Sequence, residues 1–278
     1  MNNGTRKTQV TYITLNLWFA ISMVFVSCGI VGNLWTCCVI YFGKTLWKRP
    51  TYRILFSIAF PDFISNAFCI PFETVQTLVF KSTKQYVGSD FLCIFEAILF
   101  NILMSLSNIN QMIAALYRCC AVLTPVKFKT IATIRFVSII LLACSLFPIF
   151  FHIIGGITSL VTYYVHLTMG DCSEKYFNSL VAIIYNALFQ YISFTISILC
   201  YSLIVLRIIL ASFDKNQIKE ILMRAKGSMA VCINTIICGG CICAYWLIYN
   251  SDSYGVDFEN DLWMKFAIRV SYGSNPVI

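Results

Sequence analysis

Residues 92–117 read LCIFEAILFNILMSLSNINQMIAALY and contain a single charged residue, Glu96. A membrane-crossing helix needs about 20 consecutive, mostly apolar residues, so this stretch is long enough to span a bilayer. Six further apolar runs follow the same pattern, at roughly 14–42, 54–80, 136–161, 180–208, 228–250 and 262–278. The sequence therefore predicts an all-α integral membrane protein, in which residues 1–278 form one bundle of seven transmembrane helices.

The composition agrees with a chain whose solvent is lipid. Hydrophobic residues make up 59% of the sequence and charged residues 12%, with a mean hydropathy of +0.79. Soluble domains usually carry about a quarter charged residues. The 14 cysteines lie mostly inside apolar runs, as at Cys37-Cys38, where cysteine acts as a small packing residue. Only two histidines occur, which argues against a histidine zinc site, and we expect no cofactor.

Charge predicts the orientation of the bundle. With the N-terminus outside, the three inner loops hold most of the basic residues, whereas the outer segments hold only Arg6, Lys7, Lys81, Lys84 and Lys175. This distribution follows the positive-inside rule. The net charge of +8 therefore indicates contact with an anionic inner leaflet rather than with nucleic acid.

The two ends of the chain add weaker signals. The triplet Asn3-Gly4-Thr5 is a glycosylation sequon, which predicts a modified Asn3 if this end is extracellular. The run at 262–278 is about 25 Å long as a helix, shorter than the bilayer core of about 30 Å. We therefore expect that the chain either is truncated or works without a cytoplasmic tail.

Several polar residues lie inside the apolar runs, where they are costly and therefore informative. Asn33 follows Gly32 in the first run, Asp62 is central in the second, and Arg118 ends the third. The last run ends in Asn275-Pro-Val-Ile. Together these motifs resemble the rhodopsin-like family of G-protein-coupled receptors, and the resemblance extends from the first helix to the seventh.

The resemblance implies roles for further residues. Cys93, 25 residues before Arg118, and Cys172 correspond to the family's disulfide at the outer end of the third helix; the alternative is two free thiols. Ser107 matches the family serine that joins the acid of the second helix. Arg118 and Tyr201 would contribute to G-protein coupling, the alternative for Arg118 being a basic anchor at the inner surface.

Other positions depart from the family pattern. Tyr117 stands where the acid before Arg118 is expected, and the sixth run, which includes Gly239-Gly240, lacks the family's proline. The fourth run also lacks the usual tryptophan and the fifth its proline. These departures, with the segment 118–129, look like the nematode serpentine chemoreceptor families. This implies a chemosensory receptor of the plasma membrane, including that of a sensory cilium. It would bind an extracellular small molecule or peptide and activate a heterotrimeric G protein.

A polar cluster is expected at mid-depth from Asn33, Asp62, Ser107 and Asn275. Its oxygen atoms are suitable ligands for a hard cation such as sodium. The alternative is a hydrogen-bonded network with a protonated Asp62, because burial disfavours the charged form of a carboxyl group. Either arrangement would bias the equilibrium between two helix packings.

The outer halves of the helices are the expected place for a ligand pocket. Lys265 and Arg269 are four residues apart and share a helix face, which predicts pairing with Glu73 or Glu96, or binding of an anionic ligand. The further residues expected to line the pocket are Asn101, Met104, Tyr245, Trp246 and Tyr249. The alternatives are an internal ion pair without a ligand, and aromatic residues that pack helices or lie at the membrane interface.

Two other functions compete with a signalling receptor. A receptor-like scaffold that does not signal would account for Tyr117 and for the missing proline of the sixth run. A transporter would show repeats or broken helices, and the sequence shows neither. No paired acids, nucleophile triad or phosphate loop appears where water could reach, so we do not expect an enzyme.

Overall fold

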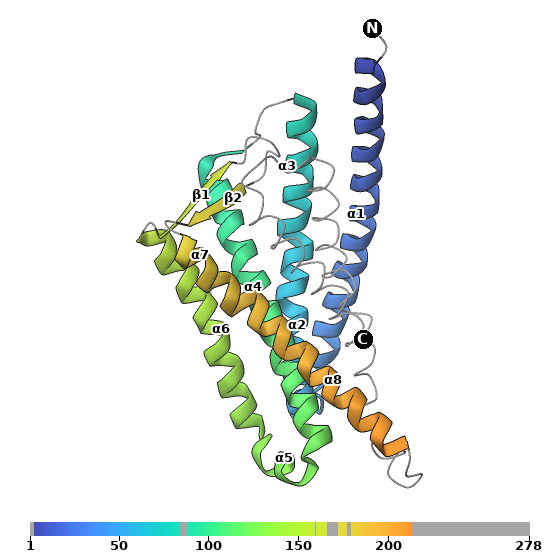
Figure 1. Ribbon diagram of the computed structural model, residues 1–278, viewed down its shortest axis with the longest axis vertical. Helices are drawn as coiled ribbons and strands as arrows, with labels where there is room; N and C mark the ends of the chain where they lie inside the picture. Colours follow the sequence, from blue (N-terminus) through green and yellow to red (C-terminus); the bar gives the residue numbers. More distant parts are fainter. Residues whose placement is uncertain (1–2, 84–87, 159, 166–171, 177–178, 213–278) are drawn as a thin grey trace.

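The computed structural model describes residues 3–83, 88–158, 160–165, 172–176 and 179–212. Within these ranges the chain is helical apart from short turns and one pair of strands, and its helices form five long rods (Figure 1). The rods are α1 (Asn3–Phe42); α2 (Pro50–Ile64) continued through the π-helical turn η1 (Ser65–Cys69) into α3 (Ile70–Thr83); α4 (Asp90–Leu123); α6 (Ile134–Ile157); and α7 (Ser179–Asn186) continued through the π-helical turn η2 (Ala187–Tyr191) into α8 (Ile192–Ser212). The short helix α5 (Pro125–Ile131) joins α4 to α6.

Each rod contains a segment that is long and apolar enough to cross a membrane. These segments are Leu15–Phe42, Pro50–Phe80, Asp90–Leu123, Ile134–Ile157 and Ala187–Leu210. They overlap the first five apolar runs of the sequence, with ends that differ by a few residues. The runs expected at 228–250 and 262–278 lie outside the described residues.

Local sequence signals fix where several helices begin. The Ser89 side chain accepts a hydrogen bond from the backbone N–H of Leu92 (3.3 Å), and Thr133 caps α6 in the same way. Such caps satisfy backbone donors that have no partner inside the helix. Pro50 and Pro125 occupy the first positions of α2 and α5. Proline suits this position because its missing N–H would be unused there anyway.

The fourth rod is shorter than the expected run 136–161, and this prediction was wrong at its end. Helix α6 ends at Ile157, and Val161–Val165 forms strand β1, paired antiparallel with β2 (Cys172–Tyr176). The Gly155-Gly156 pair weakens the last turn of the helix. The segment VTYYV that follows is β-branched and aromatic, a composition that favours a strand.

Two rods contain a π-helical turn, and the two turns differ in their local sequence. At η1 the backbone N–H of Ile70 donates to the carbonyl of Ser65, five residues earlier, and Pro71 follows directly. Proline has no N–H and its ring crowds the carbonyl four residues before it, which accounts for the widened turn. No proline lies in or beside η2; instead the Ser193 hydroxyl donates to the carbonyl of Leu188 (3.5 Å).

The distribution of side chains is that of a membrane protein. Large apolar side chains point outward, with Trp35 71% exposed and Ile139 66% exposed. Polar side chains such as Asp62, Asn66 and His152 are completely buried. Lipid tolerates the apolar exterior, whereas polar groups inside the hydrocarbon region must find partners within the bundle.

Helix α4 is the centre of the described bundle. It packs against α8 in one cluster of buried apolar side chains and against α2, α6, α7 and η2 in a second. In a third cluster it meets α1 and α3. Because α4 touches nearly every other element, it connects the hairpin end of the bundle to the end that carries α5.

Candidate functional site

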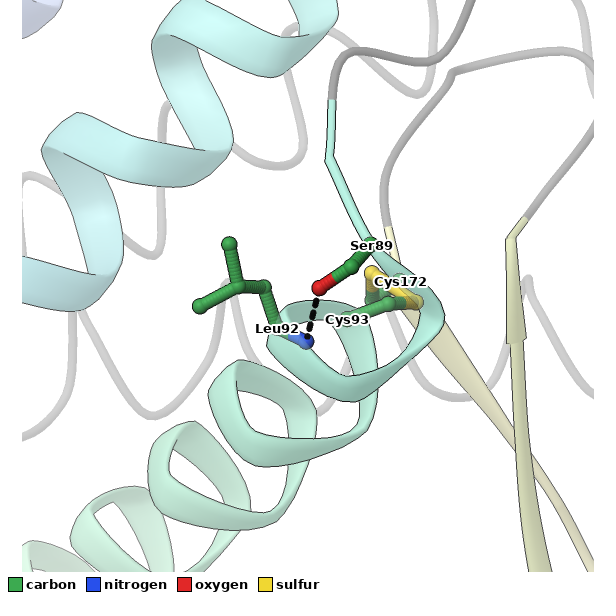
Figure 2. The surroundings of a disulfide bond; sticks show 4 residues. All are labelled: Ser89, Leu92, Cys93 and Cys172. Atoms are coloured by element: carbon green, nitrogen blue, oxygen red, sulfur yellow. Dashed lines mark hydrogen bonds between the residues drawn. A yellow bond between two sulfur atoms is a disulfide. The ribbon is translucent and has the colours of Figure 1, made fainter.

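At one end of the bundle a disulfide joins Cys93 to Cys172, as the family resemblance implied. Figure 2 shows Cys93 in the first turn of α4, beside the cap that Ser89 forms on Leu92, and Cys172 at the start of β2. The bond closes a loop of 79 residues in sequence and holds the two Cα atoms 5.3 Å apart. It therefore tethers the hairpin to the end of α4, and we call this end of the bundle the disulfide end.

The polar residues expected at mid-depth are all deeply buried where the structure describes them. Asn33 on α1, Asp62 on α2 and Ser107 on α4 expose at most 1% of their surface. Helix α2 packs against both α1 and α4, so Asp62 belongs to the rod between the other two. The fourth expected member, Asn275, lies outside the described residues.

Further amides that the sequence analysis did not single out accompany these residues. Asn66 Nδ2 donates to the backbone carbonyl of Asp62 (2.7 Å), and Gln111 Nε2 donates to Ser107 Oγ (3.2 Å). Asn110 Nδ2 reaches across from α4 to the carbonyl of Ser57 on α2 (2.8 Å). Their positions inside apolar runs were the available signal, because polar side chains are rare there.

The expected ligand-binding residues are only partly brought together. Glu73 on α3 and Glu96 on α4 both lie in the neighbourhood of Cys69, and both side chains are half-buried. Asn101 is buried and its Nδ2 donates to the carbonyl of Ala97 in its own helix (2.9 Å). Five further residues expected to line the pocket lie outside the described residues: Tyr245, Trp246, Tyr249, Lys265 and Arg269.

Met104 differs from the expectation of an open pocket wall. Its side chain is 2% exposed and packs with Val26 of α1 and Ile70 of α3. In this conformation it is a core residue that holds three rods together. A contact between Met104 and a ligand would require these rods to separate.

A chain of hydrogen bonds joins three helices and was missed by the sequence analysis. The Tyr185 hydroxyl on α7 lies 2.9 Å from Ser105 Oγ on α4 and 3.1 Å from His152 Nε2 on α6. All three side chains are completely buried. One turn further along α4, Asn108 Nδ2 donates to Gln190 Oε1 in η2 (2.7 Å). These contacts fix α7 and η2 of the fifth rod against α4 and α6.

The opposite end of the bundle carries α5 and many cationic side chains, and we call it the basic end (Figure 1). Arg118 lies half-buried in the last turns of α4. The Tyr117 ring contacts Phe128 of α5 edge to face, with 4.7 Å between ring centroids. The Thr51 hydroxyl on α2 donates to the Tyr117 hydroxyl at 3.5 Å. Tyr117 thus connects α4 with α5 and α2.

Tyr201 was expected to take part in G-protein coupling, and it lies close to this end. Its side chain is 2% exposed and packs with Cys119 and Val122 of α4. In this conformation Tyr201 is covered by the interface between α4 and α8. Among the described residues no group of three or more His, Cys, Asp or Glu side chains is arranged to hold a metal ion.

The comparison with protein families agrees with this architecture. The model of the family described as 7 transmembrane receptor (rhodopsin family) matches residues 32–270. The matched range includes Asn33, Asp62 and Arg118 but ends before Asn275. No curated protein matches the chain. This family consists of receptors rather than enzymes. The chain belongs to the rhodopsin family of seven-transmembrane receptors.

Proposed function

We propose that the protein is a chemosensory receptor of the plasma membrane that binds an extracellular small molecule or peptide and activates a heterotrimeric G protein. The observation that carries the proposal is the arrangement at the basic end, where Arg118 lies half-buried in the last turns of α4 and its neighbour Tyr117 holds the short helix α5 in place. The resemblance to serpentine chemoreceptors supports the chemosensory part, and family membership supports the receptor part.

The basic end offers a surface suitable for a cytoplasmic protein. Helix α5 projects beyond the rods, with Val126 80% exposed and Lys127 exposed beside it. The contact between Tyr117 and Phe128 fixes this helix relative to α4. Arg118 cannot lose its charge, so it requires water or a polar partner in every state of the receptor. A G protein that binds here would meet α5 and Arg118 together.

The disulfide end is the proposed ligand side. Disulfides form and persist in oxidising compartments, which supports an extracellular position for Cys93 and Cys172 and a cytoplasmic position for the basic end. Below the hairpin, the outer halves of α3 and α4 carry Glu73 and Glu96. These acids would pair with Lys265 or Arg269, or would take part in recognition of a charged ligand.

Asp62 is the proposed switch residue at mid-depth. Its complete burial, on the rod between those that carry Asn33 and Ser107, supports either a sodium site or a hydrogen-bonded network with a neutral carboxyl group. Sodium titration separates the two. A sodium site predicts that sodium lowers agonist affinity in the native receptor and not in Asp62→Asn, whereas the network predicts no sodium effect in either protein.

Ligand-dependent nucleotide exchange on a G protein tests the proposal directly. A ligand screen on the full chain in lipid nanodiscs should find compounds that accelerate exchange, and Arg118→Ala should abolish the acceleration. Arg207→Ala is the matched control, because Arg207 is an exposed arginine on α8 of the same end. Equal loss in both variants would indicate a general effect of charge and would contradict the role given to Arg118.

A receptor-like scaffold that does not signal is the second candidate. Tyr117 in place of an acid favours it, because the aromatic ring packs α5 against α4 and supplies no carboxylate beside Arg118. A scaffold predicts ligand or partner binding without nucleotide exchange for any compound. A transporter is less well supported, and it predicts substrate flux into liposomes that contain the purified protein.

A further inference from the structure

At the basic end, Arg53 joins α2 to α6. Its Nη1 donates to Ser138 Oγ on α6 (2.6 Å), and its Nε donates to the backbone carbonyl of Trp47 (3.0 Å). The guanidinium carbon also lies 5.4 Å from the centre of the Trp47 ring. A guanidinium has five N–H donors in a rigid plane. These contacts therefore hold the group in a fixed orientation and leave further donors for a bound anion.

Two more arginines lie at the same boundary. The backbone N–H of Arg53 donates to the carbonyl of Arg49 (3.4 Å), so Arg49 lies one turn before it, at the start of α2. Arg135 precedes Ser138 by three residues on α6, a spacing that makes side chains neighbours on a helix surface. The side chains of Arg49 and Arg135 are exposed. We call Arg49, Arg53, Arg135 and Ser138 the arginine cradle.

The surroundings of the cradle contain no opposite charge within the part of the chain that the structure describes. Neither residues 43–57, which lead into α2, nor residues 117–138, which lead into α6, include an Asp or Glu. Three cationic guanidinium groups at the same boundary of the bundle repel one another, and the repulsion is largest near a low-dielectric membrane. A ligand with more than one negative charge would relieve it. Arginine is well suited to phosphate because its planar donors bind two oxygens at once.

The side of the bundle next to the cradle is apolar and aromatic. The Phe56 ring contacts the Trp47 ring edge to face and stacks on the Phe60 ring, at centroid distances of 5.2 and 5.8 Å. Phe60 is 47% exposed, and on α6 Phe136 is 46% exposed. An aromatic strip thus runs along α2 from the cradle toward the middle of the membrane. This combination suits a molecule with a phosphorylated head and acyl chains better than a soluble anion.

We propose that the arginine cradle binds the headgroup of a polyanionic phospholipid, an inositol phospholipid that carries phosphomonoester groups, with its acyl chains along Phe56 and Phe60. A phosphomonoester carries a charge of about −1.5 to −2, so such a headgroup matches three arginines better than a singly charged one. Basic pockets between helices at the cytoplasmic surface are a known way to bind such lipids. The site does not depend on whether the receptor signals.

The test uses the full chain in mild detergent and short-chain lipids. We expect dioctanoyl phosphatidylinositol bisphosphate to bind at least about tenfold more tightly than dioctanoyl phosphatidylserine, measured by native mass spectrometry and microscale thermophoresis. Soluble inositol trisphosphate should bind at least about tenfold more weakly than the bisphosphate lipid, because it lacks the acyl contacts. Equal affinity for the two lipids would overturn the proposed site. Equal affinity for inositol trisphosphate and for the bisphosphate lipid would overturn the assignment of a lipid as the ligand.

The variants use the two exposed arginines, because Arg53→Gln would also remove the contacts that join α2 to α6. Arg49→Gln and Arg135→Gln should each weaken binding of the bisphosphate lipid about tenfold, the factor expected for a lost charge-assisted hydrogen bond. Arg207→Gln, on α8 of the same end, should leave the affinity unchanged, and unchanged thermal melting shows that each variant is folded. Equal weakening in Arg207→Gln would overturn the proposal in favour of general charge attraction.

Discussion

Two helix interfaces in this receptor achieve close contact by different means. Where α1 meets η1, the contact is steric, because a Cβ atom added to Gly29 would lie only 2.6 Å from Oδ1 of Asn66. Where α4 meets the α7–η2 rod, polar side chains span the gap, as in the 2.7 Å bond from Asn108 to Gln190. Lipid gives little hydrophobic driving force between helices, so small residues and hydrogen bonds are the two available means. The comparison predicts that the steric interface tolerates substitution least.

The largest expected effect is at the steric interface. Gly29→Ala should lower the free energy of unfolding by about 1–3 kcal/mol, because the new methyl group meets a buried amide that is held by its bond to the carbonyl of Asp62. Equilibrium unfolding from mixed detergent micelles measures this. Asn66→Ala in the Gly29→Ala background should restore part of the loss by making room.

A second glycine is the matched control for this prediction. A Cβ atom on Gly156 would meet only Tyr163 Cε2, at an ordinary contact distance of 3.9 Å. Gly156→Ala should therefore be close to neutral in the same assay. If both alanine substitutions cost the same, the effect comes from helix ends or the membrane environment, and the steric contact at Gly29 is not its cause.

The next effect concerns the hydrogen-bonded chain at the polar interface. Tyr185→Phe keeps the ring in place but removes the hydroxyl that contacts Ser105 and His152. We expect a loss of about 1–2 kcal/mol in the same assay, since interhelical hydrogen bonds in membranes contribute up to about 1.7 kcal/mol each. Ser105→Ala removes only one of the two contacts and should cost less. A larger cost for Ser105→Ala would show that Tyr185 is not the centre of the chain.

A smaller effect is expected one turn away, at the amide pair. Asn108→Leu and Gln190→Met keep similar volumes while removing the 2.7 Å bond. A double-mutant cycle should give a coupling energy of about 0.6 kcal/mol, the average for interhelical hydrogen bonds in lipid. A coupling energy near zero would mean that η2 is positioned by packing alone, and the polar interface would then resemble the steric one.

Sequence reasoning located the rods and several buried polar residues because both rest on properties of a single segment. Asn33 and Asp62 were expected inside the bundle from their place in apolar runs and Ser107 from the family resemblance, and the structure buries all three. The pairing of Tyr185 with His152 depends on how α7 and α6 are rotated about their axes, which no single segment specifies. Each polar residue could be identified as buried, but its partner could not.

The hairpin and the π-helical turns were missed for related reasons. The expected run 136–161 included Val161 at its end because the partner strand β2 lies 7 or more residues further along the sequence and the run itself contains no turn signal. A π-helical turn adds one residue to a rod and changes the hydrophobic period too little to be seen. Pro71 gave a local reason for η1, whereas η2 has no such signal.

The smallest expected effect tests what holds η2. The Ser193 hydroxyl reaches the carbonyl of Leu188 at 3.5 Å, the limit of a hydrogen bond, within the same rod. Ser193→Ala should therefore lower the free energy of unfolding by about 0.5 kcal/mol or less, because local serine bonds of this kind add little. This loss is smaller than the one expected for Asn108→Leu or for Gln190→Met. Ser197→Ala, which removes a 2.8 Å bond to the carbonyl of Ser193 in regular helix, is the control. If Ser193→Ala lowers the free energy of unfolding more than Asn108→Leu does, the bond within the rod stabilises η2. The hydrogen bond to α4 would then be a consequence of the π-helical turn and not its cause.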